Sequence, residues 1–246
     1  MLIRRKTMRK LLPFILAWGV MLPMLAQNEV DSTMTKVRLE TSMGDIVIAL
    51  SNLTPLHRDN FIQHVQAKDY DGVLFHRVIK DFMIQTGDLA TRPPQPEPEV
   101  KKGRNAPKQP KVKNEDLTIE AEICYPQLFH KRGAVAAARE DDATNPEHRS
   151  SGSQFYIVYG WDLNLAQAEY YTQRFDSAFN GKYKATPEVT NAYATKGGSP
   201  HLDGNYTVFG EVLEGMDVVE KIQNVDTDDA DKPKEDIRIV KAVIVE

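Results

Sequence analysis

Apolar and polar side chains alternate along residues 36–50 on both sides of the triplet Met43-Gly44-Asp45. Alternation with a period of two is typical of β-strands, and the triplet in its middle indicates a tight turn. Shorter apolar runs recur later in the chain, several of them beside glycine, at residues 73–79, 82–86, 133–138, 154–159, 206–213 and 237–245. This spacing predicts a mainly β domain, built as an antiparallel barrel or sandwich.

Two shorter segments have the pattern of helices. Thr54 precedes Pro55; a threonine hydroxyl can cap free N–H groups, and proline at the first helical position has no N–H to lose. A helix is therefore expected over about residues 55–68. The aliphatic residues of 215–223 fit one buried helical face, which predicts a second helix.

Two further stretches do not follow the strand rhythm and are interpreted as insertions. Residues 91–115 hold six prolines, with seven Lys and Arg against three Glu, a composition that favours an extended, solvated loop over a dedicated binding element. Residues 161–199 carry aromatic and aliphatic side chains at roughly helical spacing before a polar return. They predict a helical excursion packed on the barrel.

The N-terminal segment has the pattern of a signal peptide. Five basic residues lie between Arg4 and Lys10, residues 11–26 are an apolar run, and polar sequence opens at Gln27. A retained membrane anchor is the alternative, but sixteen residues interrupted by two prolines fall short of the roughly 20 that span a bilayer. Cleavage after Ala26 is expected, without stable membrane insertion afterwards.

The expected organisation is a signal peptide at 1–26, a short linker at 27–35 and one domain at 36–246. The one cysteine, Cys124, cannot form an internal disulfide, and it lies too far from the leader to be the lipidated residue of a lipoprotein. A bacterial-style signal on a chain without disulfides indicates an exported and most simply periplasmic protein.

Charge narrows the classes of partner. Without residues 1–26 the chain holds 26 basic and 35 acidic side chains, a net charge of −9. General nucleic-acid binders rely on clustered Lys and Arg, so this class is disfavoured. No metal site is expected, because the chain has no Cys-pair motif and its acidic run at 226–236 does not follow the spacing of a calcium loop. That run is interpreted as a solvated loop. No nucleotide or organic cofactor is expected either.

The densest chemical signal is FHRVIKDFMIQTGD at residues 75–88, where aromatic, cationic and amide side chains come at near-alternate positions. It resembles the signature of the cyclophilin family of peptidyl-prolyl cis-trans isomerases. Three further blocks follow in that family's order: GAVAAAR at 133–139, SGSQFYIV at 151–158 and LDGNYTVFGEV at 202–212. The resemblance implies a closed eight-stranded antiparallel barrel capped by two helices.

The reaction of that family needs residues of these types. Rotation about an X–Pro amide crosses a barrier of about 18–20 kcal/mol because the conjugation of the nitrogen is broken. A donor at the prolyl nitrogen stabilises only the twisted state, in which the lone pair is localised. Arg77 suits that role, since its guanidinium stays charged and presents fixed N–H groups. No proton transfer is required, so His76 is interpreted as structural.

The resemblance assigns further roles. Gln85 is expected to hold the substrate backbone through its amide, and Gln154 to support Arg77 by a hydrogen bond. Tyr156 stands where the family usually has phenylalanine, which adds a hydroxyl at the pocket wall, and Tyr206 replaces the commoner histidine. The other expected residues of the proline pocket and of the site for the preceding residue are Phe82, Met83, Leu202, Ala138 and Arg139.

Several of these residues have plainer interpretations. In isolation, Phe82 and Met83 would be ordinary core residues. Cys124 is interpreted as a buried small side chain and the serines at 151–153 as turn residues. His201 stands where many eukaryotic cyclophilins carry tryptophan.

Two functions from different classes remain open at this level. The first is a prolyl isomerase that accelerates X–Pro steps in exported proteins. The second is a binding or chaperone module in which the insertions provide the main contacts. The set Arg77, Phe82, Met83 and Gln85 favours the enzyme, because a pure binder needs no donor at the prolyl nitrogen. The partners would be flexible, proline-containing polypeptides, and the oligomeric state is left open.

Overall fold

The alternating segment at the start of the domain folds as the predicted hairpin. Strands β1 (Lys36–Thr41) and β2 (Gly44–Leu50) pair in antiparallel register, with Thr41 opposite Gly44.

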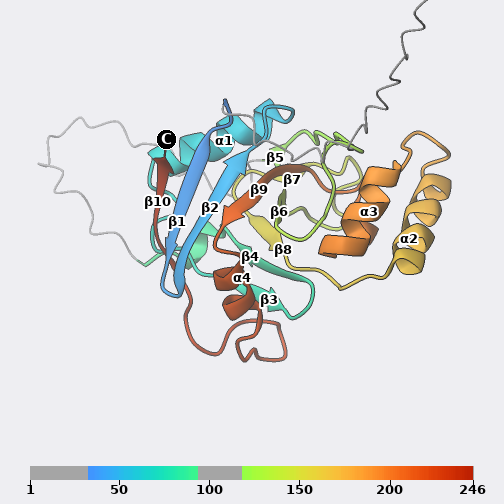
Figure 1. The fold of residues 1–246 in the computed structure, drawn as a ribbon. Coiled ribbons are helices and arrows are strands. Elements are labelled where there is room, and N and C mark those ends of the chain that lie inside the picture. Colours follow the sequence, from blue (N-terminus) through green and yellow to red (C-terminus); the bar gives the residue numbers. More distant parts are fainter. Residues whose placement is uncertain (1–32, 94–117, 246) are drawn as a thin grey trace, which may run out of the picture. The chain divides into compact units, whose positions relative to one another are not determined.

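The computed structural model describes residues 33–93 and 118–245 (Figure 1). The expected signal peptide, most of the linker and nearly all of the 91–115 insertion lie outside the described residues.

Eight strands form one antiparallel sheet, in the spatial order β10-β1-β2-β9-β6-β8-β4-β3. The remaining six are β3 (Arg77–Ile79), β4 (Met83–Thr86), β6 (Ala134–Ala137), β8 (Phe155–Val158), β9 (Val208–Glu214) and β10 (Ile239–Val245). A separate pair, β5 (Thr118–Ile119) and β7 (Ser150–Ser151), lies beside it. Each predicted apolar run thus contains a strand.

The sheet curls until its two outer strands approach each other. Leu74 bridges Arg238, the N–H of Phe75 donates to the carbonyl of Ile237, and the N–H of Ile239 donates to the carbonyl of Val73. These contacts involve the residues just before β3 and around the start of β10. The predicted eight-stranded antiparallel architecture is confirmed, and its closure consists of isolated bridges rather than a full ladder of paired strands.

The main core fills the concave side of this sheet. Strand residues at alternate positions, such as Leu39, Ile48 and Ile157, are fully buried there. Burial of apolar side chains at about 25 cal/mol per Å² is the main stabilising contribution in such a core. Phe61 from the first helix packs edge-on against Phe155 of β8, so helix and sheet share one core.

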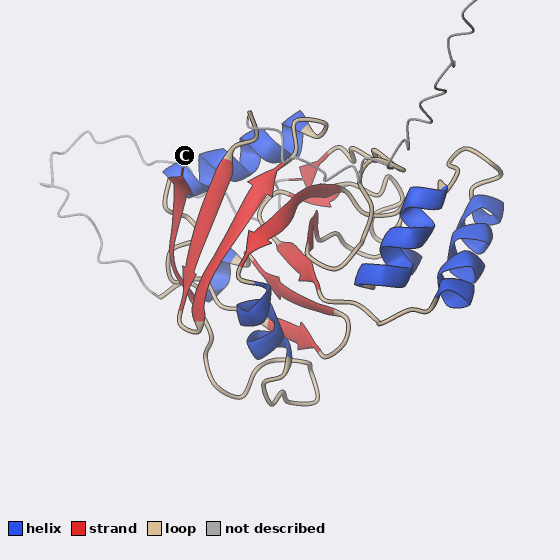
Figure 2. Cartoon of the chain, viewed as in Figure 1, coloured by secondary structure: helices blue, strands red, loops and turns tan. Residues whose placement is uncertain are grey.

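Two helices flank the sheet as predicted, and two more form the excursion (Figure 2). The first pair is α1 (Pro55–Gln66) and α4 (Met216–Gln223), and the second pair is α2 (Leu165–Ala178) and α3 (Pro187–Lys196). Short 3-10 turns lie at η1 (Leu89–Thr91) and η3 (Pro200–Leu202). Among the helices of residues 33–93 and 118–245, none is long and apolar enough to cross a membrane.

The start of α1 is capped differently from the prediction. Thr54 is the N-cap residue, but its hydroxyl makes no cap hydrogen bond and is buried without a partner. The Glu122 carboxylate accepts instead from the N–H groups of Leu56 (3.1 Å) and His57 (3.0 Å), and it contacts His57 Nδ1 at 2.7 Å. A carboxylate can cap two donors at once and complements the positive end of the helix, which a hydroxyl cannot do.

The helical excursion has its own small core. Phe175 of α2 and Tyr193 of α3 are buried against Tyr125 and Leu163, in a cluster separate from the main core. The N-cap Asn164 and Gln167 form a reciprocal capping box that starts α2. The pair lies beside the sheet (Figure 1), and its apolar faces pack on the segment around residue 125 rather than on the barrel interior.

Replacement of Glu122 by Ala is expected to lower the free energy of unfolding by about 1–3 kcal/mol, because two N–H groups of α1 and the buried ring of His57 lose their acceptor. Urea unfolding followed by circular dichroism measures the change. Glu122→Gln keeps one amide oxygen and should lose less. Glu235→Ala, at an exposed position, is the matched control, and an equal loss there would contradict the assignment.

Candidate active site

The outer face of strands β4, β6 and β8 carries a second apolar cluster. Alternation sends Ile84 and Phe155 into the main core, whereas Met83 and Tyr156, one position along, point to the opposite face. On β6 the residues of that face are alanines, which leave space above the sheet. The outer face of a strongly curled sheet thus has a hollow with an apolar floor.

Strand register brings the polar residues of this face into one row. Arg77 of β3 lies opposite Gln85 of β4, Gln85 lies opposite Tyr156 of β8, and Tyr156 lies opposite Ala136 of β6. Paired residues across neighbouring strands hold their Cβ atoms about 4.5–5.5 Å apart. Residues almost 80 positions apart in the chain therefore become neighbours through backbone hydrogen bonds alone.

The hollow is a pocket of about 340 Å³. Loops complete its wall: Phe82 precedes β4, Ala138 and Arg139 follow β6, Leu202 ends η3, and Tyr206 precedes β9. The structure brings together nine of the ten predicted site residues as its lining: Arg77, Phe82, Met83, Gln85, Ala138, Arg139, Tyr156, Leu202 and Tyr206. The tenth, Gln154, contacts this set from behind Gln85.

Gln154 was predicted to support Arg77, but its amide contacts Gln85 instead. Its Oε1 accepts a hydrogen bond from Gln85 Nε2 at 3.0 Å, and no hydrogen bond joins Gln154 to Arg77 in the part of the chain that the structure describes. Gln154 lies just before β8, next to the strand that carries Gln85, whereas Arg77 lies one strand further away. Gln154 therefore fixes the orientation of the Gln85 amide.

Arg77 is held by Asp231, an acidic residue of the run at 226–236 that is predicted to be a solvated loop. Asp231 Oδ2 lies 3.4 Å from Arg77 Nε, and both side chains are nearly half exposed, at 43% and 45%. The N–H of Val78 also donates to the carbonyl of Asp231 at 2.8 Å, so the loop between α4 and β10 docks on β3. The contact uses Nε, and Arg77 also lines the pocket.

The Tyr156 hydroxyl is directed away from the pocket by a buried polar chain. It lies 3.0 Å from His130 Nε2, while His130 Nδ1 lies 2.8 Å from Asp203 Oδ1. The carboxylate can only accept, so His130 donates to it. Tyr193 of α3 donates to the other oxygen of Asp203 at 2.6 Å. Burial raises the pKa of Tyr156 well above its usual value, so this phenol stays neutral and presents its ring to the pocket.

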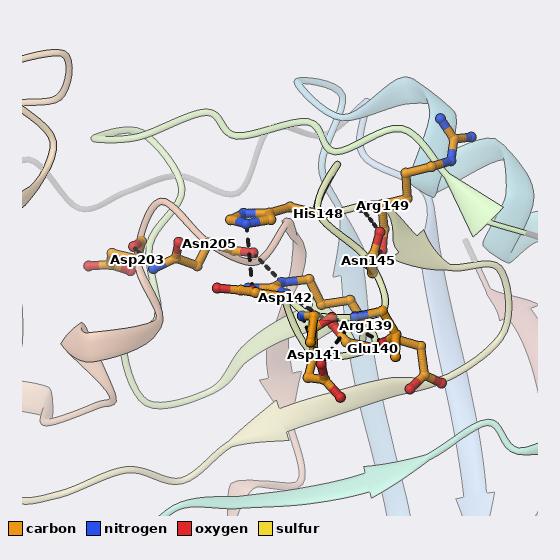
Figure 3. Close-up of polar contacts among 11 residues, drawn as sticks. Arg139, Glu140, Asp141, Asp142, Asn145, His148, Arg149, Asp203 and Asn205 are labelled. Atoms are coloured by element: carbon orange, nitrogen blue, oxygen red, sulfur yellow. Dashed lines mark hydrogen bonds and ion pairs between the residues drawn. The ribbon is translucent and has the colours of Figure 1, made fainter.

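The guanidinium of Arg139 makes hydrogen bonds within the protein through Nε and Nη1 (Figure 3). Its Nε donates to the carbonyl of Asn205 at 2.9 Å and its Nη1 donates to Asp142 Oδ1 at 2.7 Å. The guanidinium carbon lies 4.6 Å from the centre of the Tyr206 ring. The hydrogen bond from Arg139 lowers the pKa of the Asp142 carboxyl. Arg139 is thus a fixed part of the pocket wall rather than a free cation. The sequence did not predict these contacts.

Other candidate groups have modest roles. Burial is the main cause that lowers the pKa of His76, whose Nδ1 is buried without a hydrogen-bond partner. Cys124 is half-buried rather than buried as predicted; its thiol donates to the carbonyl of Leu53, and burial raises its pKa. Over residues 33–93 and 118–245, no cluster of three or more His, Cys, Asp or Glu side chains is placed to hold a metal ion.

Comparison with known proteins identifies the class of this fold and pocket. Residues 36–244 match the family described as cyclophilin type peptidyl-prolyl cis-trans isomerase. A protein named as a peptidyl-prolyl cis-trans isomerase in Staphylococcus saprophyticus is 33% identical over 221 residues, which cover 89% of this chain and 96% of that protein. One from Staphylococcus aureus strain USA300 is 31% identical over 223 residues, or 89% and 95% of the two chains.

A solved structure has the same fold. The crystal structure of a cyclophilin type peptidyl-prolyl cis-trans isomerase from Cryptosporidium parvum superposes with a TM-score of 0.57 at 23% identity, covering 87% of this chain and 98% of that one. A second structure of that protein was determined in the presence of the dipeptide Ala-Pro, with the same TM-score. The present chain belongs to the cyclophilin family and is a peptidyl-prolyl cis-trans isomerase.

Three residues at or behind this pocket were not predicted from the sequence: Asp231, His130 and Asp203. Asp231 belongs to the acidic run at 226–236, where nothing in the local pattern marks one aspartate over its neighbours. His130 and Asp203 are 73 residues apart and meet only in the fold. The one available signal was the tyrosine at 156, because a hydroxyl buried in an apolar wall requires a partner.

Asp231→Asn is expected to lower kcat/KM on an Ala-Pro peptide by about two- to fivefold, since a half-exposed ion pair contributes up to about 1 kcal/mol. The physical reason is a less restricted Arg77 guanidinium. NMR exchange spectroscopy measures the rate. The matched control is Asp229→Asn, an exposed neighbour in the same loop. A faster D231N enzyme would show that Asp231 competes with substrate for Arg77 and would refute the positioning role.

Proposed function

We propose that the 340 Å³ pocket binds the prolyl ring and that Arg77 donates a hydrogen bond to the prolyl nitrogen while the X–Pro amide twists. The observation that supports this proposal is the cross-strand row, in which Arg77 and Gln85 lie side by side at the edge of an apolar floor. An X–Pro unit has the matching chemistry. It is an apolar ring next to an amide whose nitrogen lone pair is localised only in the transition state.

The roles of the wall follow from its residues. Met83, Leu202 and the ring of Tyr156 are buried and apolar toward the pocket, which suits a pyrrolidine ring. Gln85, with its Nε2 already donated to Gln154, has an amide fixed in orientation for the substrate backbone. Fixed groups cost little reorganisation in the transition state, which is how electrostatic stabilisation becomes effective.

The contribution of Arg77 to the rate of isomerisation can be bounded. A hydrogen bond from a charged donor contributes about 1.5–3 kcal/mol. Each tenfold of rate needs about 1.4 kcal/mol of stabilisation that is present only in the transition state. Arg77 can therefore supply one to two decades of the acceleration. The pocket that excludes water from the amide and the contact to its carbonyl side would supply the rest.

Arg77→Ala should lower cis–trans exchange of a short Ala-Pro peptide by tenfold or more, while the protein stays folded by circular dichroism. NMR exchange spectroscopy on residues 27–246 measures both the parent and the variant. Arg77→Lys should restore little, because an ammonium lacks the fixed fork. Arg38→Ala, on β1 and outside the lining of the pocket, is the matched control. Full activity in R77A would overturn the donor role.

We further propose that this isomerase acts on newly exported polypeptides, with the periplasm as its compartment. Support comes from residues 1–26, whose basic start and apolar run have the pattern of a cleaved leader. Slow X–Pro isomerisation limits the folding of many chains to tens of seconds, so an isomerase is useful where unfolded chains emerge from a membrane. The flexible, proline-containing segments of such chains are the proposed substrates.

Expression of the full chain in a Gram-negative host should yield a periplasmic protein whose N-terminal residue is Gln27. Mass spectrometry of the purified protein and fractionation of the cells measure this outcome. A variant with Leu11, Leu12 and Leu16 changed to Asp should remain uncleaved in the cytoplasm, because the apolar run is interrupted. Recovery of the unchanged full chain from the cytoplasmic fraction would contradict the export proposal without affecting the isomerase assignment.

A further inference from the structure

A row of aromatic rings leads from the proline pocket onto the inserted helix α2. Its members, here called the aromatic ladder, are Phe82, His201, Trp161, Tyr171 and Tyr170. The ring centroids are 5.4 Å apart for Phe82 and His201, 4.9 Å for His201 and Trp161, 5.9 Å for Trp161 and Tyr171, and 5.4 Å for Tyr171 and Tyr170. Aromatic pairs attract each other at such separations, so the ladder is continuous.

The backbone fixes the middle of the ladder. The N–H of Trp161 donates to the carbonyl of Gly198 at 2.9 Å, and the carbonyl of Trp161 accepts from the N–H of Gly198 at 3.0 Å. A Cβ at Gly198 would lie 2.3 Å from the carbonyl oxygen of His130, so only glycine permits this approach. His201 follows three residues later in η3, which explains how two distant segments stack their rings reliably.

The ladder is exposed to an extent unusual for such large side chains. Trp161 is 37% exposed and Tyr170 is 56% exposed, and His201 is also on the surface. Exposed aromatic groups that are contiguous with a pocket are typical of binding surfaces, where they bury large apolar area at low entropic cost. The excursion at 161–199 supplies three of the five rings.

We propose that the aromatic ladder binds an aromatic or large aliphatic side chain of the same polypeptide whose proline occupies the pocket. This inference rests on the proposed role of the pocket. An extended chain advances about 3.3 Å per residue, so a side chain about three residues from the proline reaches Trp161. Such side chains are buried in folded proteins and accessible in unfolded ones, so the ladder selects unfolded segments.

Continuity with the pocket distinguishes this occupant from a second copy of the chain. The ladder begins at Phe82, which lines the pocket, and a polypeptide bound there must run past one end of it. A second copy seated on the ladder would instead cover the mouth of the pocket and hinder substrate. The substrate chain is therefore the occupant that uses both surfaces together.

The test compares Ala-Pro peptides that differ in one residue. One pair carries Phe or Ala three residues before the proline, and a second pair carries them three residues after it. We expect Phe to raise kcat/KM by about three- to tenfold in one of the two pairs, as measured by NMR exchange spectroscopy. Trp161→Ala should remove this gain and leave the rate on a short Ala-Pro peptide unchanged.

Two further variants keep the test decisive. Tyr171→Ala, one ring further along, should lose the gain for Phe placed about five residues from the proline and keep it at three. Leu56→Ala removes an exposed apolar side chain on α1 that is not part of the ladder, and it should change nothing. If turnover of Ala-Pro is normal but Phe gives no gain in either direction, the ladder proposal is wrong. If Ala-Pro is not turned over at all, the fault lies with the proposed role of the pocket.

Sedimentation of the parent protein with and without peptide tests whether a second copy of the chain binds the aromatic ladder. A monomer in both samples is expected. A dimer that W161A dissociates would show that a second copy occupies the ladder, and it would overturn the proposal.

Discussion

The register of hydrogen bonds across β3, β4, β8 and β6 is the constraint on which the site depends. It sets Arg77 opposite Gln85 and Gln85 opposite Tyr156, on the face away from the main core. Because side chains alternate along a strand, a slip of one residue would move all of them into the core and bring Ile84 and Phe155 out. The buried core therefore enforces the geometry of the site, since a slip of one residue would expose large apolar side chains.

The pocket is supported from behind by polar groups that are buried together. Tyr156, His130, Asp203 and Tyr193 form a chain of hydrogen bonds from the pocket wall to the inserted helix α3. A buried polar group without a partner costs about 1–3 kcal/mol, so each member fixes the next. The insertion is thus structurally joined to the pocket, although its apolar cluster is separate from the barrel core.

The chemistry of an isomerase suits such a rigid arrangement. Nothing is transferred, so the site needs fixed groups that fit a twisted amide better than a planar one. Gln154 fixes Gln85, Asp231 restrains Arg77, and Asn205 and Asp142 hold Arg139. Each partner comes from a different loop, so the set exists only once the sheet has curled and the loops have docked on it.

The sequence alone determined the strands, the helices and the residue types of the site, because these depend on local alternation, helical spacing and a recognisable motif at 75–88. It placed nine residues that line one pocket. It expected the Thr54 hydroxyl to cap α1 and Gln154 to support Arg77, and both expectations were wrong. It did not single out Asp231 within its solvated loop as the partner of Arg77. The contacts of Glu122 with His57, of Asp231 with Arg77 and of His201 with Trp161 join residues far apart in the chain. Only the tertiary structure decides such contacts, because they depend on where separate segments meet and not on the pattern within any one of them.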